Sequence, residues 1–161
     1  TLIGRGYRRI AFLGGPASAT STIDRLSGLA RALNKHGLKP VDAVFAGAYS
    51  HNAGQALMHQ LLRRGDLDAV FCGDDILALG ALDACVEAGV KVPQKVGVLG
   101  FNDIAMSAWP SYRLTTVRQP IGEIINAAVD MVTEMVEHGI TALPSRRFAC
   151  SLVERGTLKL V

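Results

Sequence analysis

Short apolar runs alternate along this chain with longer runs that carry apolar residues at helical spacing, and this alternation constrains the fold more than any other feature. The short runs are predicted strands at residues 9–14, 43–46, 68–72 and 96–100. The longer runs are predicted helices at residues 22–36, 51–64 (with Ser50 as the N-cap) and 75–88. Strand–helix–strand order with crossovers of this length predicts a doubly wound, mostly parallel α/β sheet flanked by helices. The run at 96–100 is apolar throughout, as burial of a strand on both faces requires.

The last third of the chain departs from this simple alternation. A short β-branched strand is predicted at 114–117, a helix from Pro120 to about His138, and a last strand at 147–153. The stretch 121–136 has an apolar face wider than contact with a single sheet needs. Two placements of this helix fit the sequence equally well: against the far face of the same sheet, or in a second lobe whose remaining strands are absent from the chain.

Composition favours one well-packed soluble domain and argues against several classes of function. Hydrophobic residues make up 49% of the 161 residues, and no stretch is both polar and low in complexity. The formal net charge of +3 comes from scattered basic residues and not from a basic stripe, which argues against a nucleic-acid surface on this chain. We expect no membrane partner, because no apolar run is long enough to span a bilayer.

The cysteines and histidines predict a reducing compartment and no metal site. Cys72, Cys85 and Cys150 lie far apart without C-x-x-C spacing, and the 4 histidines form no ligand pair. The first residues lack the apolar core and cleavage site of a signal peptide, so the expected location is the cytoplasm. Because the sequence does not begin with Met, we expect it to start within a longer protein.

Polar and aromatic residues follow the carboxyl ends of the predicted strands, which is where ligands bind in a doubly wound sheet. The candidates for ligand contact are Arg25, Tyr49, Asp74, Asn102, Trp109 and Gln119. Carboxylate, amide and guanidinium groups beside an aromatic ring suit a polyhydroxylated ligand, because the polar groups bind hydroxyls and the ring covers the C–H face. The sequence therefore predicts a small-molecule site for a polyol at this edge of the sheet.

Several of these residues also have a structural interpretation. For Asp75 we favour the N-cap of the following helix, and for Asp103 a role in capping or bracing its loop. For Asp74 we favour ligand contact. Two alternatives stay open: Arg25 as an ordinary surface charge, and the two aromatic side chains as packing residues.

No motif for catalysis or for a cofactor is found in the sequence. The stretch 14–18 lacks the Lys of a P-loop and the glycine spacing of a dinucleotide fold, and G-x-S-x-G does not occur. The pair Asp74 and Asp75 superficially resembles a receiver-domain phospho-acceptor pocket, but the first strand ends in glycines where a receiver has acids. No nucleophile–base or metal constellation lies at the strand ends, so we predict no catalytic residue, no metal and no cofactor.

Six short motifs follow one another along the chain, at residues 6–16, 25–28, 74–81, 92–103, 114–120 and 152–157. They read GYRRIAFLGGP, RLSG, DDILALGA, VPQKVGVLGFND, LTTVRQP and LVERGT. In content and order they resemble the LacI/GalR family of bacterial transcription repressors, and together they cover essentially the whole chain. Each motif alone is weak, but six in the family's order form a specific match.

The resemblance implies a two-lobed, periplasmic-binding-protein-like effector core of which this chain holds one lobe. Residues 1–119 would form the C-terminal lobe, residues 120–140 a crossover helix of the N-terminal lobe, and residues 141–161 the return strand of the C-terminal lobe. The rest of the N-terminal lobe and a helix-turn-helix head are absent from the chain.

The resemblance also implies roles for single residues. Arg25 matches the family's arginine that binds sugar hydroxyls, Tyr49 the position where an aromatic ring covers the sugar, and Gln119 a polar residue near the hinge. Asp74 stands where the family usually has Asn, and Asn102 where it usually has Asp. This exchange keeps the formal charge of the pocket but rearranges its donors and acceptors, so no particular sugar is inferred from a relative.

The function implied by the resemblance is the sensing of a sugar or sugar-acid effector by a homodimeric regulator that binds operator DNA through the absent head. The effector would shift the population of lobe arrangements. A transport-type periplasmic sugar-binding protein, which shares the fold, is the alternative from another class, and an enzyme is disfavoured.

Overall fold

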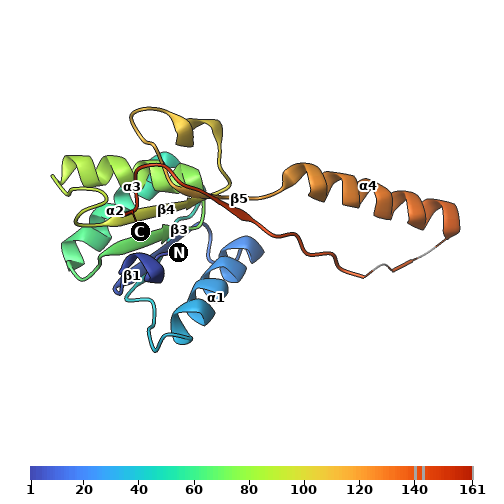
Figure 1. Cartoon of the computed structure of the whole chain (residues 1–161), viewed down its shortest axis with the longest axis horizontal. Helices are drawn as coiled ribbons and strands as arrows, with labels where there is room; N and C mark the ends of the chain where they lie inside the picture. Colours follow the sequence, from blue (N-terminus) through green and yellow to red (C-terminus); the bar gives the residue numbers. More distant parts are fainter. Residues whose placement is uncertain (140, 143, 161) are drawn as a thin grey trace.

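Six strands form one sheet in the order β2-β1-β3-β4-β5-β6 in the computed structural model, which describes residues 1–139, 141–142 and 144–160 (Figure 1). The strands are β1 (Ile10–Gly14), β2 (Ala43–Phe45), β3 (Ala69–Cys72), β4 (Gly97–Phe101), β5 (Thr116–Arg118) and β6 (Ser151–Val153). Neighbours from β2 to β5 pair in parallel, whereas β6 runs antiparallel to β5. The predicted doubly wound, mostly parallel sheet is confirmed.

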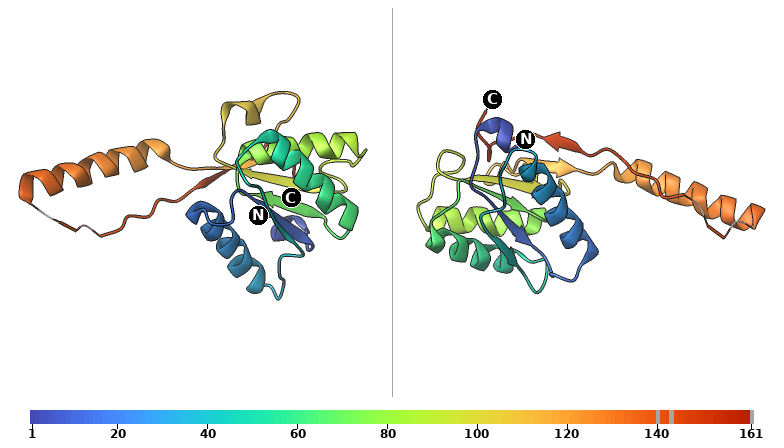
Figure 2. Two further views of the ribbon diagram at one scale, coloured as in Figure 1. Left: turned by 180° about the vertical axis from the view of Figure 1, so that it is seen from behind. Right: turned by 90° about the horizontal axis from the view of Figure 1, so that it is seen from below.

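Helices cover both faces of this sheet (Figure 2). α2 (His51–Arg64) and α3 (Asp75–Glu87) lie on one face, where Met58 and Leu77 pack in one buried cluster with Leu13 of β1. α1 (Thr20–Asn34) lies on the other face, where Leu33 is buried with Ile10 of the same strand. Alternate residues of β1 therefore belong to different cores, which is the burial on both faces that its apolar sequence predicts.

Local signals set the ends of α2 and α3. Ser50 caps α2 by accepting a hydrogen bond from the Ala53 N–H (3.3 Å), and Gly65, with φ of 77°, ends that helix in the left-handed region. α3 is capped by Asp74, whose Oδ1 accepts the Ile76 N–H at 2.7 Å. The prediction that Asp75 is the cap is wrong: Asp75 is the first residue of the helix, and its side chain points elsewhere.

α2 and α3 approach each other very closely at two glycines. A Cβ atom on Gly54 would lie 2.2 Å from the Leu77 carbonyl oxygen, and one on Gly80 would lie 2.0 Å from the His51 carbonyl oxygen. Both distances are far below van der Waals contact. The helix pair that backs β3 and β4 thus depends on the absence of side chains at these positions.

The last predicted strand is much shorter than expected. The prediction of residues 147–153 is wrong for its first half, because only Ser151–Val153 pair with a neighbour. β5 offers three residues for pairing, with Thr116 opposite Val153 and Arg118 opposite Ser151, and then leads through Pro120 into a helix. Residues 146–150 therefore have no strand beside them. The other elements deviate from prediction by one or two residues at their ends.

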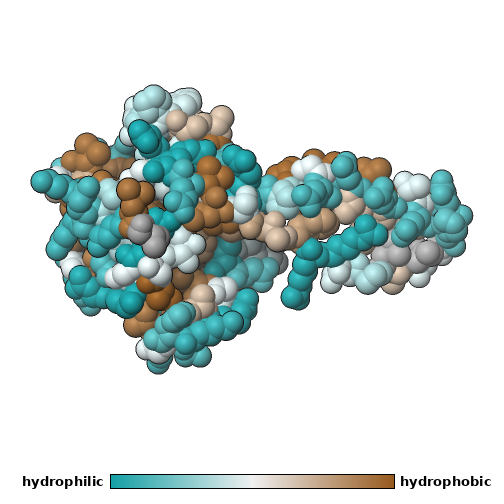
Figure 3. Space-filling model, viewed as in Figure 1, coloured by the Kyte–Doolittle hydropathy of each residue, from teal (hydrophilic) through white to brown (hydrophobic). Residues whose placement is uncertain are grey.

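α4 (Ile121–His138) projects away from the sheet and is joined to it by β5 and by the chain that returns to β6 (Figures 1 and 2). It does not cover the far face of the sheet, so that alternative placement is wrong. Large apolar side chains on it are exposed, and Figure 3 shows hydrophobic atoms along the projection. They are Ile121, Ile125, Val129, Val132, Met135 and Val136. Within the described residues, none of the helices combines the length and apolar character needed to cross a bilayer.

Candidate functional site

A chain of hydrogen bonds joins the carboxyl ends of β3, β4 and β5. Gln119, which follows β5, donates from Nε2 to Asn102 Oδ1 at 2.7 Å. Asn102, which follows β4, donates from Nδ2 to Asp74 Oδ2 at 2.6 Å. Asp74 follows β3 and uses its other oxygen to cap α3. Because parallel strands end at one edge of the sheet, three residues distant in sequence meet in one half-buried cluster.

Arg25 of α1 reaches the same corner from the other face of the sheet. Its Nη1 donates to the Gly73 carbonyl oxygen at 2.5 Å, one residue before Asp74. Its guanidinium carbon lies 4.1 Å from the centre of the Phe101 ring, one residue before Asn102. The ring and the carbonyl hold the guanidinium at the strand ends, and its remaining N–H groups are donors at the edge of the cluster.

The carboxyl group of Asp74 is electrostatically perturbed. Partial burial raises its pKa above the ordinary value of 3.8, and the neighbouring charge of Asp75 raises it further. The Ile76 N–H, the Arg25 guanidinium and the Asn102 amide oppose this shift but do not cancel it. A partly desolvated carboxylate next to an arginine forms strong hydrogen bonds with hydroxyl groups.

Tyr49 lies beside this corner, against the loop that follows β1. Its ring covers Gly15 so closely that a Cβ atom there would lie 2.2 Å from the ring. Its hydroxyl group hydrogen-bonds with Ser21 Oγ at 3.0 Å and Thr22 Oγ1 at 2.9 Å, both in the first turn of α1. Tyr49 therefore fixes the start of the helix that carries Arg25, and its side chain remains partly exposed.

Trp109 is not joined to the cluster. It follows the short 3-10 helix Ala105–Ala108 in the loop between β4 and β5, and its side chain is 52% exposed. Among the described residues, no hydrogen bond or ring contact links Trp109 to Arg25, Asp74 or Asn102. The structure thus brings together four of the six predicted contact residues, sets Tyr49 beside them, and leaves Trp109 apart.

Asp75 braces the same region from inside the core. Its side chain is fully buried; Oδ2 accepts the Ile104 N–H (2.9 Å) and the Ser107 hydroxyl (2.8 Å), and Oδ1 accepts the Thr116 hydroxyl (2.5 Å). A Cβ atom on Gly100 would lie 2.1 Å from Oδ1, so β4 needs glycine where it passes this carboxylate. Asp75 thereby fixes the loop after β4 and the start of β5, and with them the positions of Asn102 and Gln119.

Asp103 braces its loop by ion pairs. Its carboxylate accepts hydrogen bonds from Arg118 Nε and Arg155 Nη2, each at 2.6 Å, and its side chain is 7% exposed. Burial alone would raise the pKa of Asp103, but the hydrogen bonds from Arg155 and Arg118 outweigh burial and lower it. Sequence reasoning missed Arg155, which is brought here by the return strand and has no local signal.

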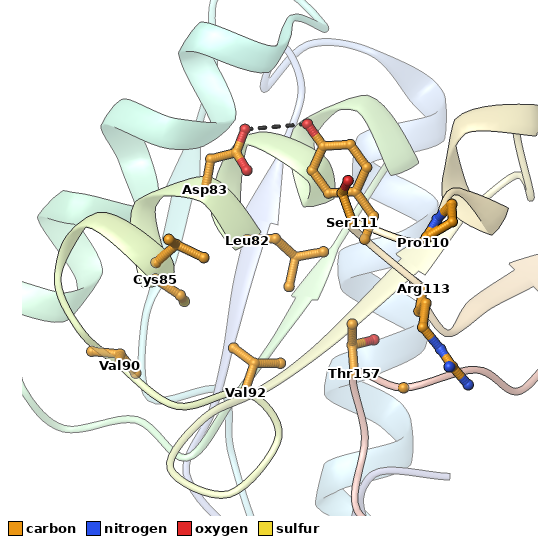
Figure 4. Close-up of a pocket in the computed structure, with 12 residues that line it drawn as sticks. Leu82, Asp83, Cys85, Val90, Val92, Pro110, Ser111, Arg113 and Thr157 are labelled. Carbon is orange, nitrogen blue, oxygen red and sulfur yellow. Dashed lines mark hydrogen bonds between the residues drawn. The ribbon is translucent and has the colours of Figure 1, made fainter.

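A separate hollow of about 370 Å³ lies along the second half of α3, away from its capped start (Figure 4). The second half of α3, the loop 110–113 and the tail at Gly156 and Thr157 form its walls, and Tyr112 donates a hydrogen bond to Asp83 at its rim (3.2 Å). None of the predicted contact residues lines this hollow. The candidate site is therefore the strand-end cluster.

Known proteins show the family to which this chain belongs. The sequence signature of the periplasmic binding protein-like domain matches residues 1–158. The chain belongs to this family, in its LacI/GalR branch. It is 33% identical over 159 residues to the HTH-type transcriptional regulator AscG of Escherichia coli K12, covering 98% of this chain and 47% of that protein. It is 32% identical over 158 residues to the ribose operon repressor of the same strain, covering 97% and 48%.

Solved structures of LacI/GalR proteins have the same fold. The lac repressor dimer bound to operator and the anti-inducer ONPF superposes with a TM-score of 0.89 at 29% identity, covering 98% of this chain and 55% of that one. The chain spans about half the length of the curated LacI/GalR relatives it matches.

Proposed function

We propose that this chain is the C-terminal lobe, with one crossover helix, of the effector-sensing core of a LacI-type transcriptional regulator. The effector is a sugar or sugar acid, and its binding changes the affinity of the whole regulator for operator DNA. The observation that carries the proposal is the convergence of Arg25, Asp74, Asn102 and Gln119 at one edge of the sheet. This set offers guanidinium, carboxylate and amide groups to a ligand rich in hydroxyls.

Each residue of the cluster has a role in this proposal. Arg25 donates to ligand hydroxyls, Asp74 accepts from them, and the Asn102 and Gln119 amides do either. Tyr49 covers one face of the ligand while holding α1 in place. Trp109, for which no described contact with the cluster is found, is given no role in the first contacts with the ligand in this proposal.

The exposed apolar face of α4 supports the division into lobes. We assign residues 1–119 and 141–161 to the C-terminal lobe and residues 120–140 to the N-terminal lobe; positions 140, 143 and 161 lie outside the described residues. α4 then packs against the remainder of the first lobe, which belongs to the half of the relatives' length that this chain does not span. Effector in the cleft between the lobes favours one lobe arrangement over another.

The partners follow from the relatives. One relative is named a ribose operon repressor, and one similar structure is a dimer bound to operator. By analogy we propose a cytoplasmic homodimer that binds DNA through a helix-turn-helix head outside this chain. A transport-type sugar-binding protein is less well supported, because the relatives named above are regulators.

The test is thermal stabilisation of the intact protein by D-ribose, D-glucose, D-galactose and D-gluconate, with and without Arg25→Ala. A ligand at 100 times its Kd stabilises the native state by about 2.7 kcal/mol, which raises Tm by several degrees. We expect Arg25→Ala to abolish this shift. Arg31→Ala, an exposed arginine two turns along α1, is the matched control and should keep it. An equal shift in the Arg25 variant contradicts the assigned site.

A further inference from the structure

Asn102 and Asp103 are neighbours in sequence whose side chains contact different parts of the molecule. Both have left-handed backbone angles, with φ of 116° and 56°. This places the Asn102 amide among the candidate ligand contacts, between Asp74 and Gln119. The Asp103 carboxylate instead contacts Arg118 and Arg155. Positive φ is uncommon for residues other than glycine, and such positions concentrate at functional sites.

Asp103 binds the end of β5, which leads to α4, and the segment that follows β6. Arg118 is the last residue of β5, on the path out to α4, whereas Arg155 lies beyond β6, after the returning chain has rejoined the sheet. One carboxylate accepts hydrogen bonds from both guanidinium groups. A single carboxylate thus links the end of β5 to the segment after β6, in addition to the backbone pairing of these two strands.

Arg155 extends this contact to the two residues that precede β5. Its Nη1 donates to the Leu114 carbonyl oxygen at 2.7 Å, and its backbone N–H donates to Thr115 Oγ1 at 3.0 Å. A movement of Asp103 therefore acts on the segment after β6 and on the approach to β5 together. The exposed Arg118 side chain has fewer contacts. Among the described residues, Asp103 is its only hydrogen-bonding partner.

We propose that Asp103 is a positioning residue that transmits a change at Asn102 to the end of β5 and to the segment after β6. This inference rests on the proposed function, in which α4 belongs to the other lobe and Asn102 contacts the effector. A two-residue turn with both residues left-handed has few alternative conformations. A ligand that displaces the Asn102 amide from Asp74 or Gln119 therefore rotates the peptide that joins it to Asp103 and moves the carboxylate.

The experiment is a double-mutant cycle read by amide hydrogen exchange on the intact protein without ligand. Asn102→Ala removes the side chain that the effector would displace. We expect it to raise exchange at residues 116–118 and 151–155 about fivefold, the equivalent of one net hydrogen bond. In an Asp103→Asn background, where the pairing with both arginines is weakened, Asn102→Ala should change exchange there by less than about twofold.

Matched variants separate this role from a general loss of structure. Asp66→Asn removes an exposed carboxylate that pairs with Arg9, and the fivefold effect should persist in that background. Arg118→Gln is a milder variant for the case that Asp103→Asn does not fold. In the Arg118→Gln background, the rise in amide exchange caused by Asn102→Ala should vanish at Thr116–Arg118 and persist at 151–155.

An equal rise in the wild-type and Asp103→Asn backgrounds would overturn the inference, because the change would then pass through the backbone bond from Asn102 N–H to Val117 O. No rise from Asn102→Ala in the wild-type background would overturn it as well. Failure of every sugar in the thermal-shift panel contradicts the proposed function and leaves the cycle standing. A failed cycle in a protein that binds sugar overturns this inference alone.

Discussion

Asp74 and Asp75 are adjacent carboxylates in opposite environments. Asp75 is fully buried with hydrogen bonds to both of its oxygens. Asp74 keeps one oxygen on the helix cap and directs the other to Asn102 at the edge of the sheet. Asp74 can therefore still accept hydrogen bonds from a ligand, whereas both oxygens of Asp75 already accept hydrogen bonds from the loop after β4 and from β5.

The raised pKa of Asp74 predicts a defined pH dependence of stability. Because its pKa is higher in the folded state, the native protein holds this proton at pH values where the unfolded chain has lost it. The free energy of unfolding should therefore fall as pH rises from about 3.8, the unperturbed value, through the folded pKa. Asp74→Asn keeps a side-chain oxygen that caps α3 but removes the titratable carboxyl group. The difference in free energy of unfolding between wild type and variant therefore isolates the titration of Asp74.

The measurement is urea denaturation of both proteins across acidic pH. The wild type should lose stability relative to Asp74→Asn as pH increases through that window, and the difference should be constant above it. Asp66→Asn, at an exposed carboxylate, serves as the control for charge removal at the surface. A difference that grows in the opposite direction would mean that the Arg25 and Asn102 contacts outweigh burial.

At the scale of elements, the contact between α2 and α3 is held by glycine, and we expect Gly80→Ala to disrupt it. The added Cβ atom would lie 2.0 Å from the His51 carbonyl oxygen and 2.7 Å from the Gln55 nitrogen, both backbone atoms that move only if the helices separate. We expect a loss of about 2 kcal/mol in the free energy of unfolding, despite the gain that alanine usually brings within a helix.

Gly28→Ala in α1 is the matched control. Its Cβ atom would meet only the Arg31 Nη2 atom, at 3.9 Å, so nothing offsets the higher helix propensity of alanine. That variant should gain about 0.5–1 kcal/mol. Denaturant midpoints at constant m-value compare the two variants, and equal effects would show that the close approach of the helices costs nothing to disturb.

The sequence predicts these elements well because their signals are local. Apolar runs, helical spacing, Ser50 at one helix start and Gly65 at its end all act within a few residues. The helix cap was predicted wrongly, because Asp74 and Asp75 have the same side chain. Only the extended backbone of Asp74 (φ −159°) decides between them. The length of β6 was missed because it depends on how far β5 extends beside it.

The site was predictable in outline because the parallel strands β3, β4 and β5 end at one edge of the sheet. The contact residues after β3, β4 and β5 follow from strand order, whereas their supports do not. Thr116 meets Asp75 across 41 positions of sequence, and Arg155 meets Asp103 across 52. Nothing near either partner in the sequence marks such a contact. Trp109 is the opposite case: it is an aromatic residue in a suitable loop, yet no described contact joins it to the cluster.

At the scale of the whole molecule, α4 is an amphipathic helix without a described partner for its apolar face. Val132 lies on that face and is 59% exposed, whereas Asn126 lies on the polar side. Substitutions at exposed positions usually change stability by less than about 0.5 kcal/mol. In the 161-residue chain alone, Val132→Lys and Asn126→Lys should therefore have equally small effects.

In the whole regulator that we propose, the two substitutions should differ. If α4 packs against the rest of the N-terminal lobe, Val132→Lys buries an unpaired charge and should lower the free energy of unfolding by about 3 kcal/mol, while Asn126→Lys stays near zero. Denaturation of both variants in both lengths of chain measures the difference that the extra sequence makes. An effect of Val132→Lys that is the same in the two chains would contradict the assignment of α4 to the N-terminal lobe and leave its apolar face for another partner.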